Sequence, residues 1–145
     1  MDDLIIRVAT LPDELPQVHQ IRYWVFQVEQ GVNSALEFDG KDETSTHLLA
    51  FLDKKPVGTT RIRWLTPQIA KVERVAVLPA ARRKGIGQRL MEYTFNFAIA
   101  KQATEVCMNA QQSVQLFYER LGFQIEGTPF EEAGIPHIKM KKSLR

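Results

Sequence analysis

The chain has 145 residues, of which 44% are hydrophobic and 25% charged, a composition typical of globular proteins and not of disordered chains. This length favours one compact domain, so we expect a single domain over residues 1–145. The formal net charge of +2 argues against a nucleic-acid-binding protein, which usually carries a larger basic excess.

The N-terminal half of the chain is predicted to contain strands and one long helix. In chain order we expect a strand at Leu4–Ala9, a helix at Pro12–Val28, and strands at His47–Leu52 and Pro56–Leu65. The helix is predicted because apolar residues recur every three or four positions and Gly31 can end it. The polar segment 33–46 is predicted to be a loop with at most a short helical turn.

The C-terminal half alternates strands and helices without a regular βαβ repeat. We expect a strand at Ile69–Leu78, a helix at Gly85–Lys101, a strand at Glu105–Ala110, a short helix at Ser113–Leu121, and strands at Phe123–Glu126 and His137–Lys141. This pattern predicts an α/β fold in the broad sense, with a mixed, mostly antiparallel sheet flanked by helices.

Cysteine usage and the N-terminal residues predict a cytoplasmic protein. Cys107 is the only cysteine, so no intrachain disulfide can form, which fits a reducing compartment. The N-terminus lacks the basic start and apolar stretch of a signal peptide. No apolar run approaches the ~20 residues of a membrane-spanning helix, so we expect no association with a membrane.

A basic, glycine-containing segment joins the strand Ile69–Leu78 to the longest predicted helix. It consists of Arg82, Arg83, Lys84, Gly85, Ile86 and Gly87. A helix start exposes amide groups without internal partners, and the helix dipole adds partial positive charge there. Glycine lets an anion approach the backbone, and the basic side chains add charge. The segment therefore predicts a phosphate-binding site.

Two common phosphate-binding loops are excluded. A Walker A loop needs Gly-Lys followed by Ser or Thr, which is missing here. A dinucleotide fingerprint needs a third glycine three residues after Gly87, where the chain has Leu90. The segment must bind phosphate in another way.

Two motifs in register resemble the GCN5-related N-acetyltransferase (GNAT) family. Residues 72–79 (VERVAVLP) followed by residues 82–87 resemble its central motif, and residues 117–123 (FYERLGF) resemble its F-Y-x-x-x-G-F segment. Residues 21–31 and the ending GIPHIKM over residues 134–140 are similar to the small bacterial subfamily that includes ElaA and YjcF. The ending is also similar to the glyphosate N-acetyltransferases.

The resemblance implies a GNAT fold whose two central strands, here Ile69–Leu78 and Glu105–Ala110, splay apart with acetyl-CoA in the gap. Backbone groups of Val75, Ala76 and Val77 would pair with the pantetheine arm, and amides from Arg82 to Gly87 would hold the pyrophosphate. The cofactor-binding set is completed by Gln111, at a position where many relatives have Asn, and by Phe117.

The resemblance also implies direct attack of a primary amine on the thioester in a ternary complex. Tyr118 matches the family tyrosine that reaches the CoA sulfur, so it is the candidate general acid. Two candidates for the base stay open. His137 matches the histidine of the glyphosate enzymes and titrates near neutrality. Glu73 lies where other relatives place a carboxylate that works through water.

The acceptor amine is not identified by the sequence. Arg22 and Arg74 match arginines that hold an anionic acceptor in the glyphosate enzymes, but a third falls on Gln111, which argues against glyphosate itself. Glu29 lies near where acceptors enter in this family. We expect a small-molecule amine, with a protein amine or an acyl group other than acetyl as alternatives. No metal is expected, because the chain has no cluster of metal-ligating residues. A homodimer is possible by analogy, because homodimers are common among relatives.

Two other classes of function compete with an enzyme. A CoA-binding sensor without catalysis would share the phosphate-binding segment and tolerate loss of Tyr118. A nucleic-acid-binding module would use the basic segment together with Arg61 and Arg63, and its binding would depend steeply on salt. The presence of both Tyr118 and His137 favours an enzyme.

Overall fold

The computed structural model describes residues 3–145, and Met1 and Asp2, part of the N-terminal segment considered above, lie outside the described residues. The strands are β1 (Leu4–Val8), β2 (Thr46–Leu52), β3 (Lys55–Thr66), β4 (Ile69–Val77), β5 (Glu105–Gln111), β6 (Gln124–Ile125), β7 (Phe130–Glu132) and β8 (Ile135–Ser143). The α-helices are α1 (Leu15–Arg22), α2 (Ser34–Glu37), α3 (Ile86–Ala100) and α4 (Gln115–Arg120). A π-helix, η1 (Tyr23–Glu29), and two 3-10 turns, η2 (Pro79–Ala81) and η3 (Gln112–Val114), complete the described elements.

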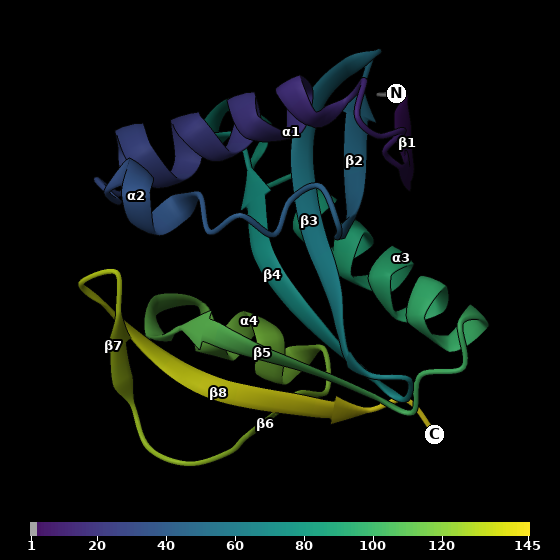
Figure 1. The fold of residues 1–145 in the computed structure, drawn as a ribbon, viewed down its shortest axis with the longest axis vertical. Coiled ribbons are helices and arrows are strands. Elements are labelled where there is room, and N and C mark those ends of the chain that lie inside the picture. The colour runs from purple at the N-terminus through teal and green to yellow at the C-terminus, as the bar shows by residue number, and fades with distance from the viewer. Residues whose placement is uncertain (1–2) are drawn as a thin grey trace. The chain divides into compact units, whose positions relative to one another are not determined.

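The described strands form one eight-stranded sheet in the order β1-β2-β3-β4-β5-β8-β6, with β7 paired to β8 (Figure 1). The ladder between β4 and β5 is parallel and joins Ile69–Lys71 to Glu105–Cys107. The ladders of β1 with β2, β2 with β3, and β8 with β5, β6 and β7 are antiparallel. The predicted fold class, a mixed and mostly antiparallel sheet with helices, is confirmed.

The chain forms two compact units, each built from two separate segments. Among the described residues, the first unit comprises 3–62 with Arg74–Thr94, and the second comprises Arg63–Glu73 with Phe95–Arg145. Strands β3 and β4 and helix α3 therefore each contribute residues to both units.

In the first unit, helices cover both faces of the strands. One apolar cluster joins Val18, Ile21 and Val25 of α1 and η1 to Leu49 of β2 and Ala76 of β4. On the opposite face Leu90 of α3 approaches β3 at Gly58, where a built Cβ would lie 2.9 Å from Leu90 Cδ1. A glycine at this position allows the close packing of α3.

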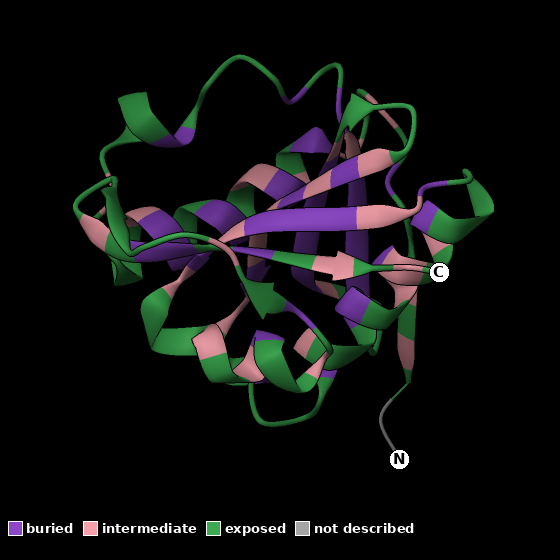
Figure 2. Ribbon diagram, turned by 90° about the horizontal axis from the view of Figure 1, so that it is seen from below, coloured by how far each residue is buried: buried purple, intermediate pink, exposed green. Residues whose placement is uncertain are grey.

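In the second unit, aromatic side chains gather beside the strands. Val106, Met108 and Met140 of β5 and β8 are at most 3% exposed. The ring of Phe123 lies 5.8 Å from Phe95 of α3 and 5.7 Å from Tyr118 of α4, measured between centroids. Figure 2 shows buried residues along the strands and exposed residues along most loops.

The predicted helix Pro12–Val28 is wrong in type over its second half. α1 ends at Arg22, and residues 23–29 continue as a π-helix in which the Gln30 amide donates to the Val25 carbonyl at 3.1 Å. The apolar residues recur at the three- and four-residue spacing of an α-helix, so periodicity predicted an α-helix throughout and gave no sign of the wider turn. Strand β7 was not predicted, because three residues carry too little pattern.

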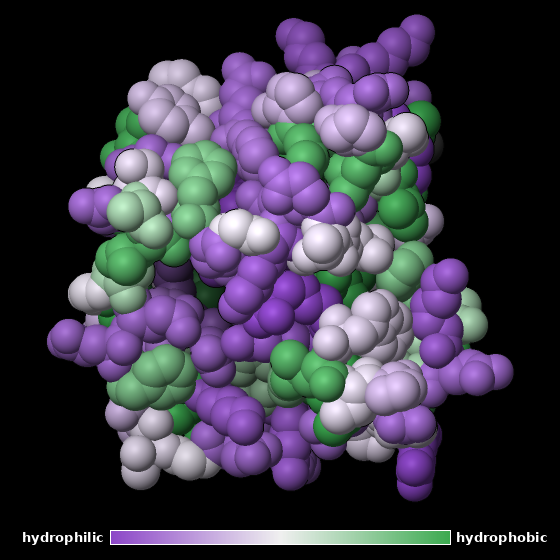
Figure 3. Space-filling view, viewed as in Figure 1, coloured by the Kyte–Doolittle hydropathy of each residue, from purple (hydrophilic) through white to green (hydrophobic). Residues whose placement is uncertain are grey.

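Large apolar side chains at the surface are scattered among hydrophilic ones on the face drawn in Figure 3. Trp24, Val28 and Leu36 are the most exposed of those in η1 and α2, at 48%, 50% and 59%. None of the helices in the described part of the chain combines the length and apolar character needed to cross a membrane.

Candidate functional site

The segment Arg82–Gly87 connects the turn η2 to helix α3. Arg83 and Gly85 have φ values of 64° and 75°, so the backbone turns sharply before the helix. Gly85 caps α3, because its carbonyl accepts the amide of Arg89 at 3.1 Å. The amides of the first helical turn, from Ile86 onward, have no carbonyl one turn earlier in the helix. They form a backbone site that suits an anion.

The cationic side chains of this segment differ in their surroundings. Arg82 donates from Nη1 and Nη2 to the two carboxylate oxygens of Glu29, both at 2.6 Å, and from Nε to the Val77 carbonyl at 3.0 Å. The hydrogen bonds from Arg82 lower the pKa of Glu29. Arg83 and Lys84 are exposed. Arg82 therefore links the segment to Glu29, the last residue of η1.

Residues Val75–Val77 end β4 and precede the segment in the same unit. Ala76 is 3% exposed and packs in the core cluster, whereas its two neighbours are half-buried. The amide of Leu78 then donates to the Val57 carbonyl of β3 at 2.8 Å. The predicted pantetheine-binding strand and the predicted pyrophosphate-binding segment thus follow one another in one compact unit.

Tyr118 lies in α4, in the second unit, and is 5% exposed. Its ring is edge-on to Phe117, with centroids 5.0 Å apart, and to Phe123 at 5.7 Å. Burial raises the pKa of Tyr118, because the phenolate would lose hydration. The phenol therefore stays protonated at neutral and mildly alkaline pH and is suited to donate a hydrogen bond. Gln111, half-buried at the end of β5, belongs to the same unit.

His137 lies in β8 and is 6% exposed. Its Nδ1 lies 2.7 Å from the Ile135 carbonyl, and because a carbonyl only accepts, Nδ1 carries the proton in this pair. In the neutral ring Nε2 is then an acceptor. Glu132 of β7 places Oε2 3.7 Å from Nε2, and the ring of Phe130 stacks on the imidazole at 6.0 Å. This arrangement presents a ring nitrogen that can take a proton.

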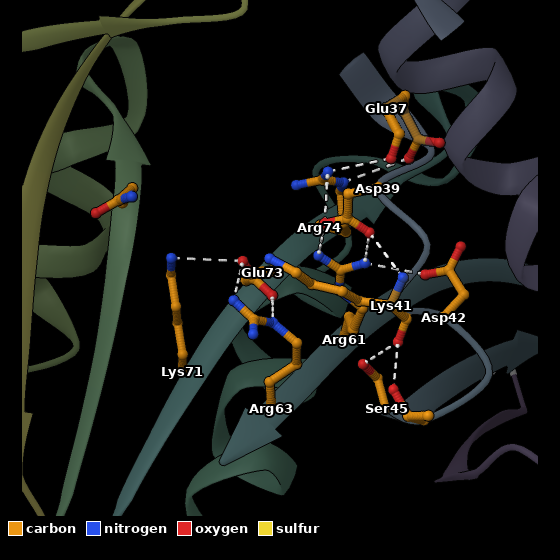
Figure 4. A network of polar contacts seen from close by, with 12 residues as sticks. Glu37, Asp39, Lys41, Asp42, Ser45, Arg61, Arg63, Lys71, Glu73 and Arg74 are labelled. Atoms are coloured by element: carbon orange, nitrogen blue, oxygen red, sulfur yellow. Dashed lines mark hydrogen bonds and ion pairs between the residues drawn. The ribbon is translucent and has the colours of Figure 1, made fainter. Parts of the chain in front are cut away.

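Glu73 lies in β4 with its carboxylate between two cations. Arg63 of β3 donates from Nε to Oε1 at 2.5 Å and from Nη2 to Oε2 at 3.2 Å. The ammonium of Lys71 lies 3.5 Å from Oε2 (Figure 4). The Glu73 carboxylate is therefore already paired with two cations. Nε2 of His137 differs, because it is an acceptor in the neutral ring.

A group of paired charges in the first unit, most of them buried, was not predicted from the sequence. We call it the arginine–carboxylate network, and it consists of Arg22, Arg61, Arg74, Glu37, Asp39 and Asp42. Arg22 donates to Glu37 at 2.6 Å and to Asp42 at 2.8 Å. Arg61 donates to Asp39 at 2.8 and 2.7 Å and to Asp42 at 3.0 Å. Figure 4 shows Arg61 and Arg74 pointing toward the carboxylates of the loop that follows α2.

The network changes the interpretation of three arginines. Arg22 is fully buried, at 0% exposure, and donates to the carboxylates of Glu37 and Asp42. Arg74 is 20% exposed and donates to the Glu37 carbonyl at 3.1 Å. Arg61 is also 0% exposed, so it cannot contribute to a nucleic-acid-binding surface.

The acidic character of segment 33–46 is visible in the sequence, but the partners of its carboxylates are not. The pairs join residues 15 to 37 positions apart in the chain, a spacing that no helix or strand period marks. Glu132 beside His137 was missed for the same reason, since β7 was not predicted. A useful signal was the presence of arginines within otherwise apolar helix and strand segments, which indicates buried charges that need partners.

Within residues 3–145, no group of three or more His, Cys, Asp or Glu side chains is arranged to hold a metal ion. His19 and His47 both contact Asp42. Nε2 of His19 lies 2.9 Å from Asp42 Oδ2, and Nε2 of His47 lies 2.8 Å from the Asp42 carbonyl. Burial lowers the pKa of His47. These two histidines thus belong to the surroundings of the arginine–carboxylate network.

Comparison with known proteins assigns the family. The family model of the acetyltransferase (GNAT) domain matches residues 14–144. The chain therefore belongs to the GNAT family of acyl-CoA-dependent N-acyltransferases, as its two motifs predicted.

Its relatives include YjcF and ElaA, the two proteins that the sequence resembled. Protein YyaT of Bacillus subtilis is 34% identical over 142 residues, which cover 96% of this chain and 95% of YyaT. The N-acetyltransferase YjcF of the same organism is 32% identical over 136 residues, covering 93% and 96%. The crystal structure of Escherichia coli ElaA matches with a TM-score of 0.84 at 29% identity, covering 98% of this chain and 99% of that chain. The likeness to ElaA and YjcF is confirmed.

Proposed function

We propose that this protein transfers an acetyl group from acetyl-CoA to a primary amine of a small-molecule acceptor, by direct attack in a ternary complex. The observation that carries the proposal is the start of α3, where Arg83 and Gly85 adopt positive φ and the first-turn amides follow directly after β4. Amides in this arrangement suit the pyrophosphate of CoA, with Arg83 and Lys84 as exposed cations beside them. The relative YjcF is described as an uncharacterized N-acetyltransferase, which agrees with this reaction.

In the proposed reaction the acceptor must first lose a proton, because a primary ammonium has a pKa of about 10.4 and cannot attack. We assign this step to Nε2 of His137, which is an acceptor when Nδ1 donates to the Ile135 carbonyl. Glu73 is the second candidate, acting through water. We prefer His137, because the Glu73 carboxylate is already paired with Arg63 and Lys71.

The amine nitrogen then forms a bond to the thioester carbon, and the carbon–sulfur bond breaks as the tetrahedral intermediate collapses. A backbone amide of residues 75–77 is proposed to stabilise the oxyanion. Tyr118 donates its phenolic proton toward the leaving sulfur, and the second proton of the amine replaces it on the collapse of the intermediate. The products are the acetamide, CoA with a protonated thiol, and one proton.

The acceptor site is proposed without Arg22, because that arginine is buried and bound to Glu37 and Asp42. Glu29 is proposed to act on the cofactor side, since both of its carboxylate oxygens accept from Arg82. Phe117, whose ring contacts Tyr118, and Gln111 at the end of β5 are proposed to border the cofactor.

The proposal is tested by mixing the purified protein with acetyl-CoA and a panel of primary amines, including amino sugars, polyamines, aminoglycosides and lysine peptides. Thiol release reports turnover, and mass spectrometry identifies the acetylated product. We expect turnover with at least one small amine and loss of turnover in His137→Ala. Binding of acetyl-CoA without turnover on any amine would favour a sensor, and absence of acetyl-CoA binding would refute the proposal.

A further inference from the structure

Arg74 has an unusual backbone conformation in the middle of a strand. Its φ is 54°, in the left-handed region, although it lies inside β4 between Glu73 and Val75. A residue with a Cβ adopts this region at a cost in free energy, and it persists only where the surroundings hold it. The conformation also redirects the peptide groups that follow it, which are those of Val75 and the next residues.

The side chain of Arg74 is held by segment 37–42. Nη2 donates to the Glu37 carbonyl at 3.1 Å and lies 3.6 Å from Asp39 Oδ2, and Nε lies 3.5 Å from Glu37 Oε1. These contacts involve both the backbone and the carboxylates of the segment (Figure 4). They can therefore fix the direction of the guanidinium as well as neutralise it.

The partners of Arg74 are themselves fixed. Glu37 is 2% exposed and accepts from Nε of Arg22 at 2.6 Å. Asp39 accepts two hydrogen bonds from Arg61, which lower its pKa against the opposing effect of burial. α2 has only four residues, so its own hydrogen bonds stabilise it little, and the contact of Arg22 with Glu37 adds to them.

We propose that Glu37 and Asp39 hold Arg74 in its left-handed conformation and so direct the amides of Val75–Val77 at acetyl-CoA. Arg74 is then a positioning residue and not an acceptor ligand. The identity of this ligand rests on the proposed function, in which these amides bind the pantetheine arm and the thioester. The network thereby makes the geometry of β4 depend on a loop that is distant in the sequence.

The decisive comparison is between Arg74→Ala and Arg74→Gly. Both remove the guanidinium, but only glycine adopts positive φ without strain. We expect Arg74→Ala to weaken acetyl-CoA binding about tenfold, as for loss of a charge-assisted hydrogen bond, and Arg74→Gly only about threefold. Equal losses of acetyl-CoA affinity in both variants would overturn the positioning role, and a raised KM for the amine with unchanged acetyl-CoA affinity would assign Arg74 to acceptor binding instead.

Arg7→Ala is the matched control. Arg7 donates to both carboxylate oxygens of Glu14, at 2.7 and 2.6 Å, and its side chain is 44% exposed. This variant removes an arginine–glutamate pair that lies outside the network. Its acetyl-CoA affinity and turnover should stay within about twofold of the wild type, since exposed ion pairs contribute little.

A measurement without any ligand separates this inference from the proposed function. Backbone NMR shifts of residues 75–77 in the ligand-free protein should move in Arg74→Ala and stay near the wild type in Arg74→Gly and Arg7→Ala. Unchanged shifts in Arg74→Ala would overturn the positioning role whether or not the protein transfers acetyl groups. If the wild type binds no acetyl-CoA, the ligand named here is wrong, and the shifts still decide whether Arg74 sets the conformation of β4.

Discussion

Replacing Tyr118 by phenylalanine removes one hydroxyl from the second unit and leaves the ring in place. The ring is 5% exposed and packs edge-on against Phe117 and Phe123 at 5.0 and 5.7 Å. Phenylalanine can make the same ring contacts, so the loss in stability should not exceed about 1 kcal/mol. For a chain of this size that corresponds to a fall of roughly 4 °C in Tm.

The effect of Tyr118→Phe on rate should be much larger than its effect on stability. Burial raises the pKa of Tyr118 above the ordinary value of 10.0, so the hydroxyl keeps its proton over the whole range of a practical assay. A hydrogen bond to a charged group contributes roughly 1.5–3 kcal/mol, and 1.36 kcal/mol corresponds to a factor of ten in rate. We therefore expect kcat to fall roughly 10- to 150-fold.

The assay measures initial rates of thiol release at saturating acetyl-CoA, with the dissociation constant of acetyl-CoA determined by calorimetry and Tm by circular dichroism. The dissociation constant should change by less than about twofold, since a bond formed only to the leaving thiolate acts on the transition state. Because the pKa of Tyr118 is raised, wild-type turnover should show no loss from phenol ionisation as the pH approaches 10. A kcat of Tyr118→Phe within twofold of the wild type would refute the general-acid role, and a large fall in Tm would assign Tyr118 to packing.

Three further predictions concern the phosphate-binding segment, the cysteine and the network. Gly85 and Gly127 both have positive φ and no atom within 4 Å of a built Cβ, so alanine at either costs about 1–2 kcal/mol in thermal denaturation. Only Gly85→Ala should weaken acetyl-CoA binding in calorimetry. Burial raises the pKa of the Cys107 thiol, so native protein should react slowly with a disulfide reagent and denatured protein rapidly, and rapid native reaction would contradict the burial. Burial opposes the charged form of Asp42, but hydrogen bonds from Arg22 and its neighbours outweigh this and lower its pKa from 3.8 to about 2. Asp42 therefore contributes stability above about pH 4 that is lost as the pH falls toward 2. The free energy of unfolding from urea denaturation should depend less steeply on pH in Asp42→Asn. An unchanged slope of that free energy against pH would contradict this prediction.

The sequence predicted most strongly the features that depend on local pattern. The start of α3 could be placed within one residue, because Gly85 and the apolar spacing that follows are both local signals. The place of β4 and β5 as the two central strands was implied only through the family, and their parallel direction was not predicted. The π-helix could not be predicted, since Val25 and Val28 have the three-residue spacing of an α-helical face, and only the structure shows Val25 buried and Val28 exposed.

The part of the candidate site that is formed by backbone amides could be predicted from the sequence. The part that is formed by paired side chains could be predicted less well. The segment Arg82–Gly87 carries its own signal, because glycine and basic residues near a helix start indicate an anion site. The partner of a charged side chain is set by tertiary structure, so the pairing of Glu29 with Arg82, 53 positions away, had no marker in the sequence. The burial of Arg22 depends in the same way on Glu37 and Asp42.

The division of the chain into two interleaved units limits how it can be cut or recombined. Each unit takes two stretches of sequence, with boundaries inside β3, β4 and α3. A single cleavage or truncation therefore cannot release either unit whole, and a gene fusion that exchanges one half of the chain would split both. Neither unit can therefore be moved into another protein as one continuous stretch of sequence. A split-protein reporter built on this chain would need both units to reassemble at once.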